Sequence, residues 1–516
     1  MIKFGNDRNS CDSLTAVLVV CLLSVLVTVP VAYGEIYRVS GEVMGRWTSG
    51  DTYLVTGDIV VPADTSLRID PNVSIQFDGN YVFLVNGSLS AVNGVEDGQS
   101  IEFSGVDGRD WVGIWFRSGG QDNSILSGCI ISNAWVGVDI QGISPSIFEN
   151  TIHALTVGII CESSRSDISG NTIIVGEGTS SQDLTGILLT NEANGLVNEN
   201  YIRVNSNLFG ELIGIKVVES RPKIRDNYID VETIGEGYGV YSLTVTKLEL
   251  VRNVIRTSSP SRMTSAFFYS STGVLVLNNT LHLMGPAESS WGLRILDRSE
   301  ILIINNIILG NELSIGIHSA DGTVVEASGH NDVWRHETNY IGDYQGNDNI
   351  DISADPLIRN ATPDAEFFAD YELIWELDED GEEIKSPCID AGSPNWKDPD
   401  NTDSDMGAVY FDHYLSAGDP SEFNRAGNPN EFELLNVYPN PFNSSTQISF
   451  MLANPNIVNA TVFNYRGQQI EHLWNSYLEK GLHSVTWSPK NISSGSYFIK
   501  VESGSQIHIS KMSYLR

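Results

Sequence analysis

The sequence predicts an all-β protein, in which a right-handed parallel β-helix with three strands per coil is followed by a small C-terminal β-sandwich. Two internal markers predict the β-helix: an asparagine recurs about every 26 residues, and a glycine recurs in phase with it. A change of pattern predicts the second domain, because roughly the last 80 residues alternate apolar and polar positions between short turns. At 516 residues the chain is long enough for several domains.

The first 34 residues are typical of an export signal. Lys3 and Arg8 precede an apolar run over residues 14–29, and a small-residue site follows at Ala32-Tyr33-Gly34. The run is shorter than the roughly 20 apolar residues that a membrane-spanning helix needs. We therefore expect residues 1–34 to be a signal peptide cleaved after Gly34, and the mature chain to work outside the cytoplasm without a transmembrane anchor.

The asparagine marker is followed two residues later by an aliphatic side chain, as in "ENTI", "DNYI" and "RNVI". Its successive intervals are 21, 29, 27, 26, 26, 27 and 25 residues. The marker residues are Asn150, Asn171, Asn200, Asn227, Asn253, Asn279, Asn306 and Asn331. Three short alternating segments per interval predict three strands per coil, which stacked coils would pair in parallel about 4.8 Å apart. We expect each asparagine to hydrogen-bond to the asparagine of the next coil.

The glycine marker is followed by an aliphatic residue and runs in phase with the asparagines. Its members are Gly113, Gly137, Gly158, Gly186, Gly214, Gly239, Gly292 and Gly316, with Ala266 expected to fill the one gap. The expected core stack is Ile152, Ile173, Ile202, Ile229, Ile255, Leu281 and Ile308. An antiparallel sandwich would instead show turns about every 8 to 12 residues and no markers in phase. The pattern therefore assigns residues 35–340 to the β-helix.

The residue two positions after each glycine is expected to point outward, because its two neighbours are aliphatic or small. This stripe reads Trp115, Asp139, Ile160, Leu188, Lys216, Tyr241, Phe268, Arg294 and His318. At strand spacing it would form a line about 40 Å long. A sugar chain could lie along it, with aromatic faces for pyranose rings and cations for carboxylates. The predicted ligand-binding face comprises Trp115, Asp139, Lys216, Tyr241, Phe268, Arg294 and His318.

Over roughly residues 35–410 the repeats resemble those of secreted parallel β-helix proteins with pectate-lyase-like folds. Polysaccharide lyases of this fold use a basic residue to take a proton beside a uronate, and a cation or metal to neutralise its carboxylate. The resemblance implies two candidate catalytic pairs, Lys216 with Tyr241 and Arg294 with His318. The two cations lie three coils apart, about 14 Å, so they cannot serve one bond.

Hydrolysis of a glycosidic bond would need two or three clustered carboxylates, and Asp139 is the only acid on the stripe. Most coils also stay near 26 residues, which leaves little room for long catalytic loops. We therefore expect a non-catalytic protein that binds glycans or surfaces or has a structural role. A polysaccharide lyase or glycoside hydrolase acting on acidic polysaccharides is the alternative, and a solvent-facing stripe without chemistry also stays open.

Residues 341–412 form an acidic segment that we expect to cap the last coil; its "SPCIDAG" and "DMGA" resemble the closing segment of secreted β-helix proteins. Of the formal net charge of −35, much comes from residues 341–430, with 22 Asp/Glu against four Lys/Arg. Such a field repels nucleic acid and attracts divalent cations, so no nucleic-acid partner is expected. Calcium is the possible cofactor, with a solvated acidic turn as the alternative. The candidate ligands are Asp398, Asp400, Asn401, Asp403 and Asp405.

Residues 413–433 are rich in Gly, Pro, Ser and Asn and have no apolar period, so they are expected to be a linker. Residues 434–516 then alternate strongly, as in "STQISFML" and "GSYFIKVES". Several antiparallel strands of this kind in about 80 residues predict a small immunoglobulin-like β-sandwich.

Within this last segment "YPNPFNSSTQISF", "YRGQQI", "KGLHSVTW", "SSGSYFIKV" and "KMSYL" resemble the type A C-terminal sorting domain of the type IX secretion system of Gram-negative, Bacteroidetes-like bacteria. The resemblance implies passage through the periplasm and recognition by the secretion machinery at the outer membrane. It also implies removal of the domain, followed by release or attachment to surface lipopolysaccharide. The residues that match the family's motifs are Pro439, Asn440, Pro441, Phe442, Gly467, Gly481, Gly495, Tyr497 and Lys511.

Overall fold

The structure is a computed structural model of the chain. It describes residues 34–514 apart from 94–99, 119–122, 180, 182, 288, 326–327, 348–349, 360–370, 378–380, 399, 401, 412, 414–432, 439–441, 443–444, 453–454, 465–468, 479–480, 491, 493–494 and 504–505. Except for Gly34, the predicted signal peptide lies outside the described residues, as does the predicted linker except for its two end residues. Among the described residues, no helix is both long and apolar enough to cross a membrane.

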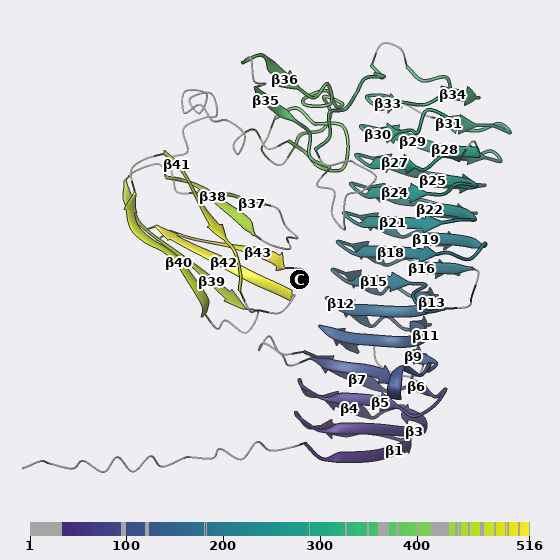
Figure 1. Ribbon diagram of the computed structural model, residues 1–516, viewed down its shortest axis with the longest axis vertical. Coiled ribbons are helices and arrows are strands. Elements are labelled where there is room, and N and C mark those ends of the chain that lie inside the picture. The colour runs from purple at the N-terminus through teal and green to yellow at the C-terminus, as the bar shows by residue number, and fades with distance from the viewer. Residues whose placement is uncertain are drawn as a thin grey trace, which may run out of the picture. The chain divides into compact units, whose positions relative to one another are not determined.

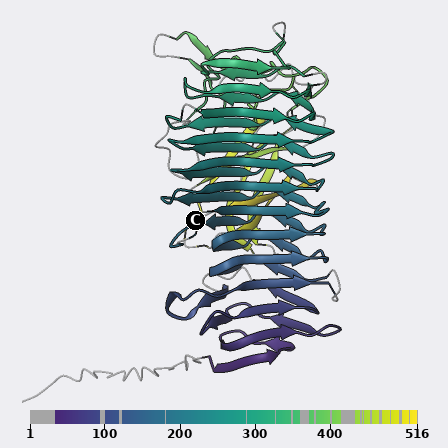
Figure 2. The ribbon, with the colours of Figure 1, turned by 90° about the vertical axis from the view of Figure 1, so that its right-hand side faces the viewer.

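The first part of the described chain winds into a β-solenoid of about 11 turns (Figure 1). Its strands pair in parallel with their equivalents in the neighbouring coil and form three ladders. Figure 2 shows the stacked strands of one side of the solenoid. The long strands β1, β3, β11 and β13 run through a bend and contribute to both ladder 1 and ladder 2. A short 3₁₀ turn, η1 (Val106–Gly108), interrupts the early coils.

Ladder 1 contains β1 (Ile36–Glu42), β3 (Thr52–Val61), β5 (Ser74–Phe77), β8 (Ile101–Gly105), β11 (Cys129–Gln141), β13 (Thr151–Glu162), β15 (Thr172–Val175), β18 (Tyr201–Ser206), β21 (Tyr228–Thr233), β24 (Val254–Ser258), β27 (Thr280–Met284), β30 (Ile307–Leu309) and β33 (Asp332–Trp334). Ladder 2 adds β6 (Val82–Val85), β9 (Gly113–Arg117), β16 (Leu184–Thr190), β19 (Glu211–Val218), β22 (Glu236–Leu243), β25 (Arg262–Tyr269), β28 (Ser289–Leu296), β31 (Ile315–Ser319) and β34 (Thr338–Gly342). Ladder 3 contains β2 (Gly45–Trp47), β4 (Ser66–Ile69), β7 (Ser88–Val92), β10 (Ile125–Ser127), β12 (Ser146–Phe148), β14 (Asp167–Ser169), β17 (Leu196–Asn198), β20 (Lys223–Arg225), β23 (Glu249–Val251), β26 (Val274–Leu277), β29 (Glu300–Ile304) and β32 (Val324–Val325).

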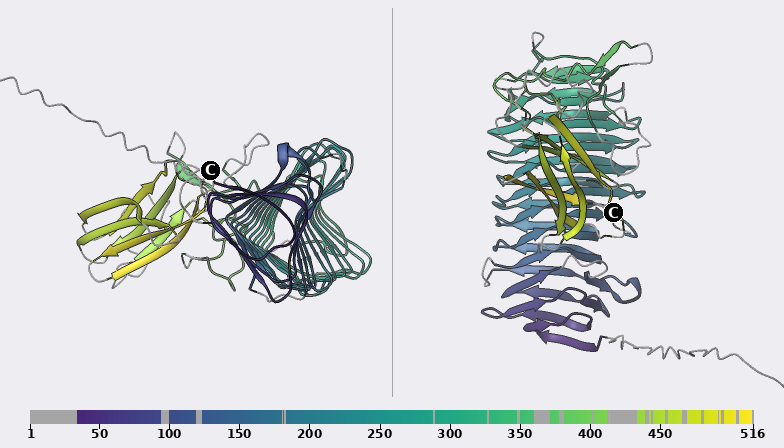
Figure 3. Two further views of the ribbon diagram at one scale, coloured as in Figure 1. Left: turned by 90° about the horizontal axis from the view of Figure 1, so that it is seen from below. Right: turned by 90° about the vertical axis from the view of Figure 1, so that its left-hand side faces the viewer.

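The core of the solenoid is a set of aliphatic columns inside the coils. The left view of Figure 3 looks along the stack of coils that encloses this core. Each strand alternates, so one side chain in two points inward. All seven residues of the predicted core stack, from Ile152 to Ile308, have a relative exposure of 0%. This prediction is confirmed, and it fixes which residues of ladders 1 and 2 face outward.

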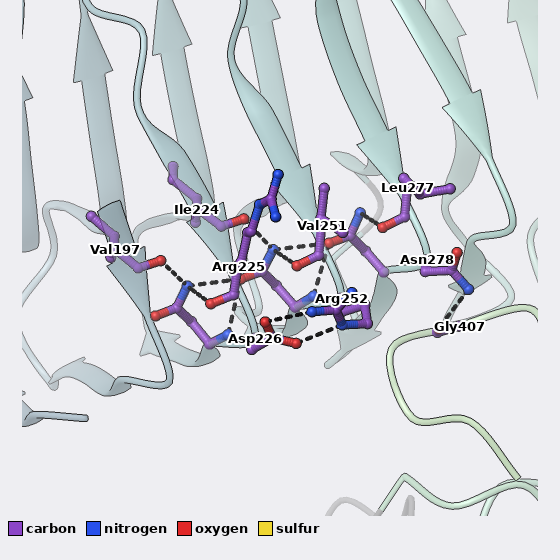
Figure 4. A network of polar contacts seen from close by, with 12 residues as sticks. Val197, Ile224, Arg225, Asp226, Val251, Arg252, Leu277, Asn278 and Gly407 are labelled. Atoms are coloured by element: carbon purple, nitrogen blue, oxygen red, sulfur yellow. Dashed lines mark hydrogen bonds and ion pairs between the residues drawn. The ribbon is translucent and has the colours of Figure 1, made fainter. Parts of the chain in front are cut away.

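The asparagine ladder is also confirmed. Each marker asparagine after Asn150 accepts, through its side-chain oxygen, the backbone N–H and the side-chain amide of the preceding one, at 2.9 to 3.0 Å. Each amide also donates to a ladder 3 carbonyl of the preceding coil, such as those of Val197 and Ile224 (Figure 4). Asp351 ends the ladder by accepting from Asn331. The buried polar groups of this corner are therefore satisfied from one coil to the next.

Seven of the eight marker glycines lie in close contact with a core side chain. A Cβ on Gly214 would lie 2.3 Å from Cγ2 of Ile229, and the same clash with a β-branched residue recurs at Gly137, Gly158, Gly186, Gly239, Gly292 and Gly316. The prediction that Ala266 fills the gap is wrong, because Ala266 pairs with Val240 and the residue opposite Gly239 is Ser265. Since Gly239 faces Ile255 and Ile255 pairs with Leu281, register places Leu281, which has no Cγ2, opposite Ser265. Leucine thus leaves room for the serine Cβ.

The acidic segment packs against the last coils. Its one described hairpin pairs β35 (Trp375–Leu377) with β36 (Glu383–Lys385) in antiparallel. Asn278 donates to the carbonyls of Asp405 and Gly407, the second of which Figure 4 shows. Cys388, Ile389, Met406 and Phe411 form a small buried cluster with Ile307 and Leu373. The segment is therefore held to the solenoid by apolar packing and by hydrogen bonds from a solenoid side chain to its backbone carbonyls.

The C-terminal segment forms two small antiparallel sheets. One contains β37 (Glu433–Tyr438), β38 (Thr446–Leu452) and β41 (Gly481–Trp487). The other contains β40 (Gln469–Leu478), β39 (Asn456–Asn464), β42 (Gly495–Ser503) and β43 (Gln506–Tyr514). They share one apolar core, which includes Ile448, Val462, Trp487 and Ile499.

Asn227→Ala should destabilise the solenoid strongly. The side chain donates three hydrogen bonds and accepts two, all within the ladder corner. Loss of buried partners on both sides should reduce the free energy of unfolding by about 2 to 4 kcal/mol. Urea unfolding followed by tryptophan fluorescence measures the change. Asn198→Ala, on an outward position of β17 next to Val197, is the control and should lie within about 0.5 kcal/mol of the parent.

Leu281→Ile should introduce a clash with the Cβ of Ser265 and reduce the free energy of unfolding by about 1 to 3 kcal/mol. Ser265→Gly in the same chain should remove most of this loss. The double-mutant cycle, measured by the same urea unfolding, gives the coupling between the two positions. Equal losses from Leu281→Ile with serine or glycine at position 265 would contradict the packing argument.

Candidate functional site

The predicted outward stripe lies in ladder 2 as one continuous row. Strand register aligns Trp115, Asp139, Ile160, Leu188, Lys216, Tyr241, Phe267, Arg294 and His318. The prediction for Phe268 is wrong, because that side chain points into the core and is 0% exposed. Phe267 takes its place in the row, since the coil is aligned through Ser265 and neighbouring residues of a strand face opposite sides.

A second outward row runs beside the first and holds residues that the sequence analysis missed. Register aligns Ile213, Tyr238, Thr264, Trp291 and Ile315. Tyr238 and Trp291 each stand directly before a marker glycine. In these coils the residue directly before the marker glycine faces outward, as does the residue two positions after it. The position before the glycine could therefore have been read from the sequence.

The two rows together form what we call the aromatic face: Lys216, Tyr238, Tyr241, Phe267, Trp291, Arg294 and His318. Tyr238 and Phe267 are nearly buried at 6% and 8% exposure, and the other members are partly exposed around them. The rings of Tyr241 and Phe267 lie 4.9 Å apart, and Tyr238 meets Tyr241 edge-on at 4.9 Å. These contacts hold the rings in fixed orientations.

The cations of the aromatic face lie over its rings. The Lys216 ammonium is 5.3 Å from the centre of Tyr241. The Arg294 guanidinium is 4.3 Å from Trp291 and 5.8 Å from Phe267. Such cation–π contacts position the charge while leaving its outer side available to an anion.

Acidic residues border the aromatic face at one edge. Glu211 lies 3.7 Å from Lys216, and Glu236 accepts hydrogen bonds from Tyr238 at 3.1 Å and from Arg262 at 2.8 Å. Burial, followed by these two glutamates, raises the pKa of Tyr241. Tyr241 therefore stays protonated at neutral pH.

The imidazole of His318 stands beside Arg294 in the register and 6.5 Å from the ring of Trp291. Burial, followed by the neighbouring guanidinium, lowers the pKa of His318. His318 is therefore neutral at neutral pH. Its Nδ1, the Nε of Arg294 and the indole Nε1 of Trp291 are buried and have no hydrogen-bond partner among the described residues.

The candidate catalytic residues fall into the two pairs that the sequence predicted. Lys216 and Tyr241 are neighbours in the register, as are Arg294 and His318, and Phe267 lies between the two pairs. Asp139, the one acid of the row, forms a salt bridge with Arg117 at 2.8 Å. The row therefore offers a cation beside a neutral imidazole, but its one carboxylate is already paired.

The members of the predicted calcium set are held mainly by hydrogen bonds of their own segment. Asp398 accepts the backbone N–H of Asp405, Asp400 accepts from Thr402 and His413, and Asp403 pairs with Lys397. Asn401 lies outside the described residues. Asp405 is fully buried and its carboxylate accepts the backbone N–H groups of Asp390 and Phe411 at 2.7 and 2.6 Å.

Among the described residues, the ligand-type side chains whose ligand atoms converge are Asp390, Asp405 and His413. Only Asp405 belongs to the predicted calcium set. Asp390 comes from the "CIDAG" turn and His413 is the first residue of the predicted linker, and a search for closely spaced acids does not connect them.

The predicted sorting residues that can be described lie in the C-terminal sheets. Phe442 is buried between Trp487 and Tyr514, with ring centres 5.4 and 5.2 Å apart. Tyr497 is 1% exposed and packs on Trp487. Gly481, Gly495 and Lys511 lie in β41, β42 and β43. Pro439, Asn440, Pro441 and Gly467 lie outside the described residues.

Residues 436–513 match the family model described as "Secretion system C-terminal sorting domain". No curated protein and no solved structure matches the chain. The match covers both C-terminal sheets and includes Phe442 and Tyr497 of the core described above. The chain is therefore a β-solenoid protein with a type A sorting domain of the type IX secretion system, which directs it to secretion or to the cell surface of a Gram-negative bacterium of the Bacteroidetes.

Proposed function

We propose that the aromatic face binds acidic polysaccharide outside the cell without cleaving it. The observation that carries the proposal is the placement of Arg294 over Trp291 and of Lys216 over Tyr241, on one outward surface of five consecutive coils. Aromatic rings can stack on the apolar faces of pyranose rings, and the two cations can donate hydrogen bonds to the carboxylates of the sugar units.

The spacing of the face suits an extended polymer. The strands from β19 to β31 are four coil steps apart, which is about 19 Å at strand spacing. The surface is continuous along the axis because each coil contributes residues at the same two register positions. A chain of several sugar units would therefore contact more than one cation at once, which increases its affinity.

The charges of the face favour binding over hydrolysis. Glycoside hydrolysis needs a pair of carboxylates, one on each side of the scissile bond. The row offers one carboxylate, that of Asp139, and it is paired with Arg117. Tyr241 is held protonated by burial and by the nearby glutamates. Neither group is suited to act as a base at neutral pH.

A polysaccharide lyase is the second candidate, and the pairing of Arg294 with His318 favours it. A neutral imidazole can take a proton, and the adjacent guanidinium can neutralise the carboxylate that makes this proton acidic. In this case His318 is the base and Arg294 the neutralising cation.

We also propose the hand of the solenoid, the class of the C-terminal domain and the fate of that domain after export. Right-handed winding agrees with the strong preference of parallel crossover connections for that hand. The two C-terminal sheets around one core agree with an immunoglobulin-like sandwich. Removal of this domain after export, with release or attachment to surface lipopolysaccharide, follows from its resemblance to the sorting family.

Trp291→Ala and Arg294→Ala should each weaken the binding of the protein to polygalacturonate or alginate about tenfold, because each removes a central contact of the face. Affinity electrophoresis in gels containing the polymer measures the change. Trp396→Ala is the control, since this tryptophan is 45% exposed but lies in the acidic segment. Unchanged binding in both test variants would contradict the proposal.

The same polymers, incubated with the protein and followed by the absorbance of unsaturated uronates, separate binding from lyase activity. Under the first proposal no absorbance appears. Absorbance that is lost in His318→Ala, with binding retained, would replace the binding proposal with the lyase.

Deletion of residues 434–516 should leave the protein in the periplasm, because the sorting domain is what the outer-membrane machinery recognises. Cell fractionation and surface labelling measure the distribution. A milder variant, Phe442→Ala, removes a buried core ring and should reduce surface display in proportion to the destabilisation of the domain. Normal display of the truncated protein would contradict the sorting role.

A further inference from the structure

We propose that Asp390, Asp405 and His413 form a binding site for a divalent transition metal, with zinc as the main occupant. The site shares only Asp405 with the predicted calcium set and takes a different metal. It joins the acidic segment to the first residue of the predicted linker and is independent of the aromatic face.

The ligand atoms are already gathered. One carboxylate oxygen from each aspartate and one ring nitrogen of His413 lie within 4.8 Å of one another. The His413 Nε2 and the Asp390 Oδ1 are 3.3 Å apart. Two ligands of a tetrahedral zinc, with metal–ligand distances of about 2.0 to 2.2 Å, are about 3.3 to 3.5 Å apart. The spacing of this pair is therefore that of two ligands on one metal.

The imidazole nitrogen has the surroundings of a metal ligand. The Nε2 of His413 is buried and makes no hydrogen bond among the described residues, although Asp390 stands next to it. The ring meets Trp375 and Phe411 edge-on, with centres 5.5 and 5.3 Å away. Aromatic packing thus fixes the ring with this nitrogen toward the carboxylates, so binding would require little reordering.

The two carboxylates are oriented by groups that leave room for a metal. The Asp405 oxygens each accept one backbone N–H, from Asp390 and Phe411, and a carboxylate oxygen has a second lone pair. On Asp390 the Lys385 ammonium lies 3.3 Å from Oδ2, whereas His413 faces Oδ1. Outer contacts of this kind hold metal ligands in place.

The charge of the region favours a cation. Asp405 is fully buried and lies beside the carboxylates of Asp390 and Asp398. Among the described residues, the Lys385 ammonium contacts this group through Asp390. A bound divalent ion would compensate the remaining negative charge.

The donor set selects the class of metal. Calcium takes six to eight oxygen ligands, whereas this group offers one nitrogen and two oxygens. Zinc, cobalt, nickel and manganese accept imidazole with carboxylate, and zinc binds more tightly than manganese or cobalt at such sites. The metal would connect the "CIDAG" turn, the "DMGA" turn and the start of the predicted linker, and so stabilise the packing of the acidic segment on the last coils.

The test is metal uptake by the untagged full chain. After removal of metals with a chelator, equilibrium dialysis against micromolar zinc and metal analysis should find one zinc per chain. Cobalt should bind with the intense visible absorption of a four-coordinate site. Zinc should also raise the melting temperature, since a ligand that binds only the folded state stabilises it.

Variants identify the ligands. His413→Ala and Asp390→Asn should reduce zinc affinity at least a hundredfold. His472→Ala, an exposed histidine of β40, and Asp403→Asn, an acid of the same segment, are matched controls and should bind as the parent does. Circular dichroism confirms that each variant is folded.

Three results would overturn the proposal. The first is no zinc or cobalt uptake by the folded parent chain at micromolar metal. The second is uptake that is equal in His413→Ala and the parent. The third is binding of calcium in preference to zinc, lost in Asp398→Asn and Asp400→Asn but kept in His413→Ala, which would place a calcium ion in the acidic turn instead.

Discussion

The buried column of asparagine amides is the constraint on which the rest of the solenoid depends. Each side chain bonds to its equivalent in the next coil and to a carbonyl of the preceding coil. A slip of one residue between two coils would leave several buried donors without acceptors, and would also turn the aliphatic core residues outward. The column therefore fixes the parallel register, and the register determines which outward side chains become neighbours.

The aromatic face is a consequence of that register. Its residues are about 26 positions apart in sequence, yet the ladders bring them to strand spacing, with Arg294 directly beside Phe267 and His318. No loop is needed to assemble such a surface. Its affinity for a polymer would depend on how many successive coils carry a ring or a cation, and five consecutive coils here do so.

The sequence predicted the fold well because buried polar ladders and close glycine contacts restrict residue type at every coil. It predicted the face less well. Ser265 replaced a marker glycine, and the neighbouring Ala266 shifted the expected outward residue from Phe267 to Phe268. Tyr238 and Trp291 were missed because the pattern was followed on one side of the glycine only. The group around His413 depends on contacts between residues far apart in sequence, which local spacing cannot reveal.

Ser265 and Leu281 stand at positions where the neighbouring coils have glycine and isoleucine, and this paired replacement bears on how the solenoid could evolve. The two changes, on β25 and β27, compensate each other within one pair of residues, while the pairs on both sides remain glycine and isoleucine. The steric fit is thus solved separately by each pair, whereas the asparagine amides form one continuous column. Such a molecule can be lengthened, shortened or diversified by whole coils during evolution, provided that every inserted unit carries its own matched pair and an asparagine to continue the column.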